Sequence, residues 1–546
     1  MTGRYMQAIT PDLEAFQVDA LMRLDGDTLA HIFEFLRPFR ALVALSTTCK
    51  WIREACKPTM FRKCSLIGHV YPYFDLDWKS RILPAAVRAH VITLSIACIF
   101  RRLGDDWMLT ESNAYGRVYQ PLINELALMP KLRNIMLYAQ EDDGIPWEAL
   151  KAILAIPQVR SLSFKGLFDR RDSLPWNIRQ LPLSPVAPLH RLSYRTKPYG
   201  ASPSRTEVDF FVRYLQEARS QDSLEVFEMA GHCAPPELLN GACWSHLRVL
   251  SLHGWQFDVQ STSTTPCDMP LVSVLGCMAA LRELSLKMAH LRGTIQRYVW
   301  PPGLDTSLPW PDLESFVLSH PRAGDQICAH LPSSLRHLSL LCWPRHYIYR
   351  DRRRRETMDE YGWGSPVLTS SELLSLLSSC RTSALEQLDI EFRADYAERA
   401  LLRLLGSKFP VLTVLTIHRY SDEGPDDVPV SAIGDALSAL RHLRVLRIGV
   451  DTTDYSRMYD YDSEDSMAAL EIPASIFART LAPEVEMVCF LRRYSRRARF
   501  FPFRIIREDH ALPNAVYEPR VSKICGISIY DEDEPPLAMS AAIEYD

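Results

Sequence analysis

The sequence predicts an α/β protein in which a small three-helix module precedes an irregular right-handed solenoid with parallel strands on its concave face. Three observations predict this fold. Apolar residues near the N-terminus recur every three or four positions, a short apolar pattern returns many times along the rest of the chain, and helix-like segments separate its copies. A single core stops growing at about 250–300 residues, so a chain of 546 residues needs several domains or an extended repeat.

The first predicted helix carries one apolar face. The residues of that face follow the spacing i, i+3, i+4, i+7, and they are Leu29, Ile32, Phe33 and Leu36. Asp25 and Asp27 stand at its start, where carboxylates can accept hydrogen bonds from the free N–H groups of the first turn. Pro38 is expected to end this helix, because a proline has no N–H group to continue the hydrogen bonding.

Two further short helices are predicted directly after the first one. Their apolar stripes are Leu42, Leu45 and Cys49, then Trp51 and Ile52. Pro58 is expected to stop the third helix. Three helices of this size bury little apolar surface by themselves. The module must therefore pack against the rest of the chain, against a partner protein, or against both.

The residues of this module resemble the F-box. The matching positions are Leu24, Ile32-Phe33, Phe35-Leu36, Leu42, Leu45 and Cys49-Lys50-Trp51. The match runs without a gap from Leu24 to Leu36, and Asp25 stands where the family has proline. Members of this family bind a Skp-type adaptor, which connects them to a cullin–RING ubiquitin ligase.

The resemblance implies an adaptor-binding set on the helical module. Its members are Leu24, Ile32, Phe33, Leu36, Leu42, Leu45, Cys49 and Trp51. Those that stay exposed in the isolated chain are expected to face the adaptor. The alternative interpretation is a plain three-helix cap, whose apolar face packs on the chain's own solenoid.

The rest of the chain repeats the order apolar, two variable, apolar, one variable, apolar. The best copies are Leu247-Leu250-Leu252, Leu281-Leu284-Leu286, Leu313-Phe316-Leu318, Leu335-Leu338-Leu340, Leu385-Leu388-Ile390, Leu412-Leu415-Ile417 and Leu443-Leu446-Ile448. Weaker copies begin at Val91, Leu132, Val159, Leu189, Leu224, Val485 and Ile524. This is the core pattern of a leucine-rich repeat, in which each copy is a short parallel strand with its apolar side chains pointing inward.

Segments between the copies read as helices, and strands that pair in parallel need such crossovers. The spacing of the copies is irregular, and the Asn or Cys that usually follows the strand is mostly absent. The array therefore resembles the degenerate repeats of fungal F-box/leucine-rich-repeat proteins.

The variable positions between the repeated leucines are expected to form the concave face, because successive strand residues point to opposite sides. The candidate substrate-binding residues on it are Ser251, His253, Glu283, Lys287, His337, Gln387, Asp389, Glu391, His418 and Arg447. Together with the F-box resemblance they suggest a substrate-recognition subunit of an SCF-type (Skp adaptor–cullin–F-box) ubiquitin ligase, whose protein substrate is unknown. For the individual residues, the alternative is that they are only solvated strand surface. For the protein, the alternative is a leucine-rich-repeat scaffold or inhibitor without a ubiquitin role.

The predicted organisation is an N-terminal segment (1–19), the helical module (20–65), the solenoid (66–529) and an acidic tail (530–546). An insertion at 342–366 contains the four arginines Arg352–Arg355. This run suggests a nuclear-import signal or a binding site for an acidic partner, and the alternative is a solvated loop. A second insertion at 451–466 is acidic and rich in Tyr and Ser. This composition suggests a phosphorylation site or a binding site for a basic partner, and the alternative is a disordered surface loop. Residues 492–507 mix arginines with aromatics and suggest either nucleic-acid stacking or a terminal repeat.

No catalytic, cofactor or metal motif occurs in the sequence, so we expect a non-catalytic protein without a cofactor. The 13 cysteines are scattered and lack zinc-ligand spacing, which is typical of reduced thiols. The net charge of −4 does not favour a nucleic-acid partner, and neither a membrane span nor a secretory signal is recognisable. The expected location is the cytoplasm, the nucleus or both.

Overall fold

The computed structural model describes residues 23–36, 39–70, 83–100, 123–139, 150, 153–165, 188–195, 205–217, 222–240, 244–255, 269–294, 296–346, 356, 358–421, 430–450, 464–494, 497–508 and 511–518. The chain divides into two compact units. The first consists of Met1–Phe164, Phe168–Ser173 and Ser184–Ala187, and the second of Lys165–Leu167, Leu174–Leu183 and Pro188–Asp546. Each unit is described by itself.

The first unit begins with the three predicted helices, α2 (Gly26–Phe35), α3 (Phe39–Ser46) and α4 (Lys50–Met60). Asp25 caps α2, because its carboxylate accepts hydrogen bonds from the backbone N–H groups of Asp27 at 3.0 Å and Thr28 at 2.9 Å. The prediction that Pro58 stops the third helix is wrong. The proline lies in the last turn of α4, where the Phe61 N–H still reaches the carbonyl of Lys57 at 2.9 Å.

The strands β1 (Lys63–Val70), β2 (Thr93–Phe100) and β3 (Asn134–Ala139) follow and pair in parallel, with the short helix α6 (Ala85–Arg88) before β2. Strand β4 (Ser161–Lys165) is next in the sheet order, and all of its residues except Lys165 belong to this unit. The apolar positions predicted for β2, β3 and β4 are all buried. Strand β1 was not predicted, because only Leu66 of its described side chains is a buried apolar residue and the repeat pattern is incomplete.

The second unit alternates strands with helices in chain order. The parallel strands are β5 (Arg191–Arg195), β6 (Val226–Ala230), β7 (Val249–Gly254), β8 (Glu283–Met288), β10 (Ser315–Leu318), β11 (His337–Leu340), β13 (Gln387–Arg393), β14 (Val414–Tyr420), β15 (Val445–Val450) and β16 (Met487–Tyr494). The helices are α9 (Arg205–Glu217), η4 (Gly231–Cys233), α10 (Pro236–Asn240), α11 (Leu271–Val274), α12 (Ile327–His330), α15 (Ser370–Ser378), α16 (Glu398–Lys408), α17 (Val430–Leu437) and α18 (Glu464–Thr480).

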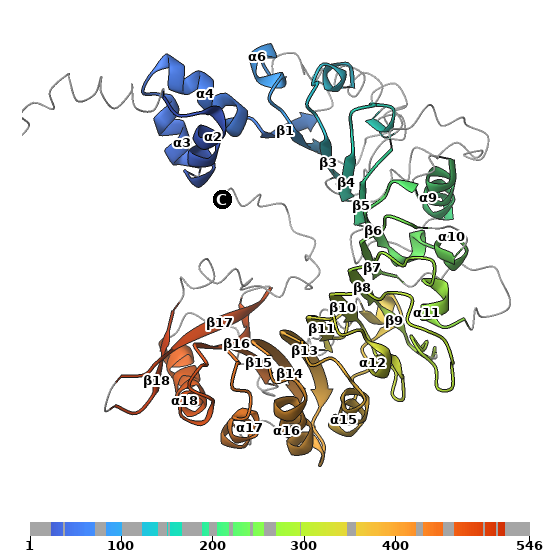
Figure 1. Cartoon of the computed structure of the whole chain (residues 1–546), viewed down its shortest axis with the longest axis vertical. Helices are drawn as coiled ribbons and strands as arrows, with labels where there is room; N and C mark the ends of the chain where they lie inside the picture. The colour runs from blue at the N-terminus through green and yellow to red at the C-terminus, as the bar shows by residue number, and fades with distance from the viewer. Residues whose placement is uncertain are drawn as a thin grey trace, which may run out of the picture. The chain divides into compact units, whose positions relative to one another are not determined.

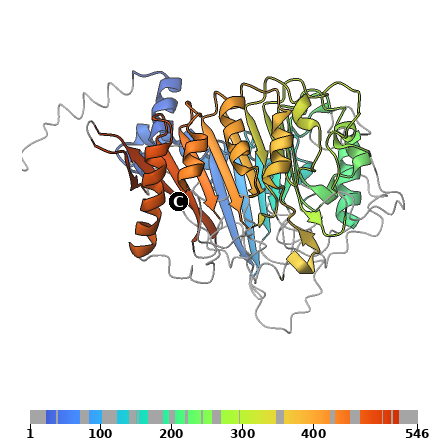
Figure 2. The ribbon, with the colours of Figure 1, turned by 90° about the horizontal axis from the view of Figure 1, so that it is seen from below.

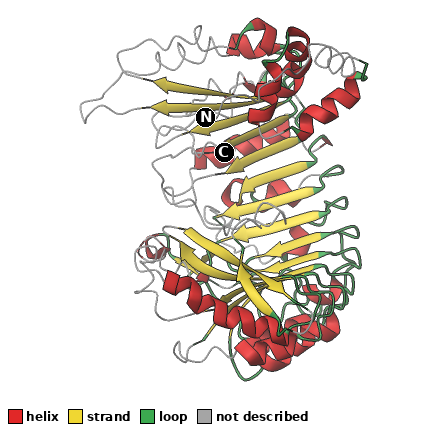
Figure 3. Ribbon diagram, turned by 90° about the vertical axis from the view of Figure 1, so that its left-hand side faces the viewer, coloured by secondary structure: helices red, strands yellow, loops and turns green. Residues whose placement is uncertain are grey.

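The helices of this unit that Figure 1 labels, α9 to α12 and α15 to α18, lie on one side of its strands. The strands run side by side as a ladder (Figure 3), and β13 to β15 with their helices are seen from another direction in Figure 2. We call the side of this sheet that faces away from the helices the inner strand face.

The repeat pattern is confirmed as the source of these parallel strands. Every apolar position of the seven best copies is at most 5% exposed. Equivalent positions stand opposite each other across the strands, as Leu250 does with Leu284 and Leu338 with Leu388. The weaker copies are buried in the same way, except the one at Ile524, which lies outside the described residues.

The predicted insertion at 342–366 is only partly a separate segment. Its strand β12 (Trp363–Gly364) pairs antiparallel with β9 (His290–Leu291), and the rings of Trp343 and Trp363 pack with Trp255 in a buried aromatic cluster. Arg352–Arg355 lie outside the described residues, as do most of the insertion at 451–466, the segment 1–19 and the tail 530–546.

The end of the sheet differs from the predicted terminal repeat. Strand β17 (Arg497–Ile506) pairs antiparallel with β16, and β18 (Asn514–Tyr517) pairs antiparallel with β17. Phe500, Phe501 and Phe503 are buried, so the aromatic residues of this segment close the core. Among the described helices, none has both the length and the apolar character needed to cross a membrane.

Candidate functional site

The helical module has a small closed core. It consists of Leu29, Phe33, Leu42, Ile52 and Cys56, each at most 7% exposed. Of the predicted adaptor-binding residues, Phe33 and Leu42 therefore lie inside the module. The other six are only partly buried around this core, and they are Leu24, Ile32, Leu36, Leu45, Cys49 and Trp51.

Phe35 is the most exposed apolar side chain of this module, with 87% of its surface open to solvent. It stands at the end of α2, next to the half-buried Leu36. The candidate set omitted Phe35, although it belongs to the aromatic-leucine pair of the resemblance. The helical periodicity did not select it, because Phe35 is off the stripe that contains Phe33.

Charged and polar side chains connect segments of the module at its surface. Arg62, after α4, forms an ion pair with Glu34 of α2 at 2.8 Å. The hydrogen bonds that Asp25 accepts from the Thr28 hydroxyl and backbone hold the pKa of this carboxyl below its ordinary value. Asp25 thus caps the helix that carries Phe35.

The inner strand face of the second unit carries a hydrogen-bonded group at β10, β11 and β13. The ring of His337 contacts the hydroxyl of Ser315 through Nδ1 at 3.0 Å and the carboxylate of Asp389 through Nε2 at 2.9 Å. Gln387 donates to the same carboxylate at 3.2 Å. Burial alone would raise the pKa of Asp389. The hydrogen bond and charge of His337, the Thr416 hydroxyl and the charge of Arg447 together outweigh it and hold this pKa below its ordinary value.

A second charged group lies at β5 and β6. Glu228 accepts hydrogen bonds from Arg191 at 2.6 Å, Arg195 at 3.2 Å and the Ser193 hydroxyl at 2.7 Å. Nearby on β7, burial and the charge of Arg195 lower the pKa of His253 to about 3, so this ring is neutral at physiological pH.

The predicted substrate-binding residues divide by burial. Asp389, Glu391 and His418 are each at most 7% exposed. The carboxylate of Glu391 is a structural group, because it accepts hydrogen bonds from the Cys342 backbone N–H and the Tyr420 hydroxyl, each at 2.6 Å. The predicted residues that keep some exposed surface are Ser251, His253, Glu283, Lys287, His337, Gln387 and Arg447.

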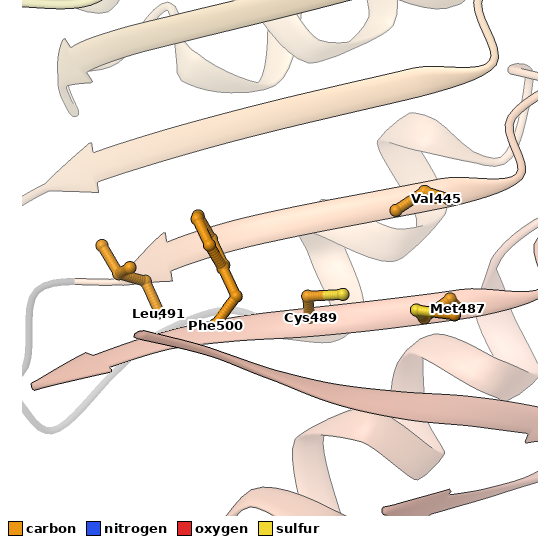
Figure 4. Packing of buried hydrophobic residues seen from close by; sticks show 5 residues of the cluster. All are labelled: Val445, Met487, Cys489, Leu491 and Phe500. Carbon is orange, nitrogen blue, oxygen red and sulfur yellow. The ribbon is translucent and has the colours of Figure 1, made fainter. Parts of the chain in front are cut away.

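The last strands of the inner face carry an apolar group that the sequence reasoning missed. We call it the apolar stripe, and it consists of Val414, Val445, Met487, Cys489, Leu491 and Phe500. In Figure 4 the ring of Phe500 points toward the strand that carries Val445. A usable signal was present, since the position just before the second repeated apolar residue is Val, Val and Met in three successive copies.

Among the described residues, no group of three or more His, Cys, Asp or Glu side chains is placed to hold a metal ion. The cysteines that the structure describes with their side chains are free thiols. Both ring nitrogens of His337 are already hydrogen bonded.

No protein-family model matches the chain, and no curated protein matches it in sequence. One solved structure that matches is titled the crystal structure of the Rad7 and Elc1 complex in yeast. It is 12% identical, the match covers 78% of this chain and 97% of that chain, and the TM-score of 0.31 describes only a loose likeness.

Proposed function

We propose that this protein is the substrate-recognition subunit of an SCF-type ubiquitin ligase. It binds a Skp-type adaptor through the helical module and a protein substrate on the inner strand face. The observation that carries this proposal is the surface of the helical module, where the exposed Phe35 stands beside the half-buried Leu36 at F-box spacing.

The energetics of the module support a partner at this surface. Its own core is complete without Phe35, so the exposed ring contributes little to folding of the module. Fully burying a phenylalanine is worth about 1.5–3 kcal/mol, and aromatic side chains that bind in pockets dominate many protein interfaces. A groove on an adaptor that accepts Phe35 and its half-buried neighbours gains this free energy.

The protein itself performs no chemistry in this proposal. It raises the effective concentration of substrate lysines next to a ubiquitin-charged enzyme, which belongs to the cullin–RING part of the complex. The exposed polar residues of the inner strand face, such as Lys287 and Gln387, are the substrate-contacting group.

The test is binding of the purified chain to a Skp-type adaptor, with Phe35→Ala as the decisive variant. We expect a loss of at least about tenfold in affinity, since one buried aromatic ring exceeds the 1.4 kcal/mol that a factor of ten requires. Tyr396→Ala is the matched control, because Tyr396 is 94% exposed but lies in the second unit. Phe33→Ala is unsuitable, because Phe33 belongs to the core of the module. Equal binding by wild type and Phe35→Ala contradicts the proposed surface.

A second candidate function is a leucine-rich-repeat scaffold or inhibitor, in which the helical module only caps the repeats. One observation favours it, since α4 ends at Met60, β1 begins at Lys63, and both lie in one compact unit. A folded wild-type protein that binds no Skp-type adaptor supports this candidate over the ligase subunit.

A further inference from the structure

Two cysteines from neighbouring repeats lie together in the second unit. Cys328 belongs to α12, which precedes β11, and Cys380 comes directly after α15 and its cap residue Ser379, before β13. Strands β11 and β13 pair in parallel, so the segments that lead into them are neighbours too. Both cysteines are fully buried, and the thiol of Cys328 donates a hydrogen bond to that of Cys380. The fold thus brings together two thiols from positions far apart in the sequence.

A second pair of cysteines lies in the helical module and provides a contrast. Cys49 is the cap residue of α4, and Cys56 lies two turns further along the same helix. These two act on each other through charge rather than through a hydrogen bond. Residues that far apart on a helix are separated by about 10 Å, whereas the Cα atoms joined by a disulfide lie within about 7 Å of each other. Cys49 and Cys56 therefore cannot form a disulfide in the folded module.

The surroundings make Cys328 and Cys380 unequal. The hydrogen bond from Cys328 lowers the pKa of the Cys380 thiol, and the charge of Lys408 and the Thr382 hydroxyl act in the same direction, against the effect of burial. Donation of that hydrogen bond, together with burial, raises the pKa of the Cys328 thiol well above its ordinary value. Cys380 is therefore the thiol that ionises more readily, and a thiolate is the form that reacts with oxidants. A reactive thiol next to a second thiol is the usual arrangement for disulfide formation.

Cys380 lies close to the surface of the unit, although no part of it is exposed. Ser378, two residues before it, is exposed, and its carbonyl accepts a hydrogen bond from the ammonium group of Lys408 at 2.9 Å. The same ammonium group favours the ionised form of the Cys380 thiol. Helix ends open more readily than helix centres, so opening of the last turn of α15 admits a small oxidant to Cys380.

We propose that Cys328 and Cys380 form a reversible disulfide when the folded protein is exposed to hydrogen peroxide. The bond joins the two repeats whose strands contribute His337 and Asp389 to the inner strand face. It concerns the second unit alone and is independent of the proposed function.

The reaction has two steps. The thiolate of Cys380 attacks one oxygen of the peroxide, the O–O bond breaks, and hydroxide leaves a sulfenic acid on Cys380; the hydroxide becomes water with the proton that Cys380 gave up. The sulfur of Cys328 then attacks the sulfur of Cys380, so the S–S bond forms, the S–O bond breaks, and a second water leaves with the proton of Cys328. The two thiols lose two electrons, which reduce one peroxide to two waters.

Mass spectrometry of the full chain after treatment with hydrogen peroxide tests the proposal. The remaining thiols are alkylated, and the protein is digested without reduction. We expect one main cross-linked pair of peptides, which joins Cys328 to Cys380 and disappears after reduction with dithiothreitol. Cys49 and Cys56 serve as the internal control and stay unlinked. The same treatment in urea is expected to give a mixture of pairs, because the unfolded chain no longer selects two thiols.

Single variants test which thiol reacts first. In Cys328→Ala the sulfenic acid on Cys380 lacks its partner thiol, so dimedone should label it at least about ten times more than it labels Cys328 in Cys380→Ala. Lys408→Gln removes the charge near Cys380, while the amide can still donate to the Ser378 carbonyl, and it should slow the cross-link about threefold. Arg403→Gln is the matched control and keeps the wild-type rate, since Arg403 is an exposed cation on the same helix, α16.

A folded wild-type protein without the link between Cys328 and Cys380, or with the same mixture of pairs as in urea, overturns the proposal. Stronger dimedone labelling of Cys328 than of Cys380 also overturns it, since Cys380 would then not be the attacking thiol.

Discussion

The inner strand face of the second unit contains two regions with the same backbone and different chemistry. At β10, β11 and β13 the side chains form a hydrogen-bonded group around His337 and Asp389. At β14, β15 and β16 the positions that align with His337 and Gln387 are Val414, Val445 and Met487, which belong to the apolar stripe. The repeated apolar residues behind the two regions are equally buried. The repeat therefore determines the scaffold, and the alternate positions are free to determine what each region binds.

The largest expected effect tests whether the two regions really share one scaffold. Leu388 lies behind the polar region and Leu446 behind the apolar stripe, and both are fully buried. Leu388→Ala and Leu446→Ala should each lower the free energy of unfolding by about 2–5 kcal/mol. Urea denaturation measures both values, with the half-buried Gln387→Ala as the control. If only one of the two variants had a lower free energy of unfolding, the two regions would not depend equally on the buried repeat residues.

An intermediate effect should distinguish the polar region by its pH dependence. The pKa of Asp389 is lower in the folded protein than its ordinary value, so the ionised carboxylate stabilises the fold above that ordinary value. This contribution is lost as the pH falls through the lowered pKa. Asp389→Asn should therefore cost about 2 kcal/mol near pH 7, and the difference from wild type should shrink toward pH 3. Denaturation curves across this range check the prediction, and a cost independent of pH would contradict it.

The smallest effect compares one substitution in both regions. Val445→Thr places a hydroxyl in the buried stripe without a change in shape, and we expect it to cost about 1 kcal/mol. Val317→Thr makes the same change at a half-buried position of the polar region, where the expected cost is close to zero. Thermal unfolding of the two variants measures the contrast. An equal loss of unfolding free energy in the two variants would mean that Val445 is no better shielded from water than Val317.

The scaffold was predictable because burial demands an apolar residue at fixed positions. In the sequence, the repeat pattern around Leu250, Leu284 and Phe316 predicts three strands. In the structure these residues stand opposite each other on neighbouring strands. The helix that contains Phe33 was predictable for the same reason. What periodicity cannot supply is the direction of a neighbouring side chain, so Phe33 was placed with the adaptor-binding residues and the exposed Phe35 was left out.

Pairing between strands that are far apart in the sequence explains the other differences between the predicted and the observed structure. Strand β12 forms only because β9 lies beside it, and no local signal marks two-residue strands such as Trp363–Gly364. Likewise, a polar or apolar residue at an alternate position, such as Val445, has no definite environment until the neighbouring strands are in place. The division of the predicted substrate-binding residues into buried and exposed groups was therefore beyond the sequence.

The antiparallel pairing of β16, β17 and β18 limits how such a protein can grow. An additional repeat requires a free parallel edge, and the hairpin formed by β17 and β18 removes that edge after β16. A repeat added directly after β16 would have to displace β17, because β17 already pairs with that edge. A repeat gained or lost inside the array leaves the β16–β18 pairing in place, so the array can lengthen or shorten in its middle without a new end.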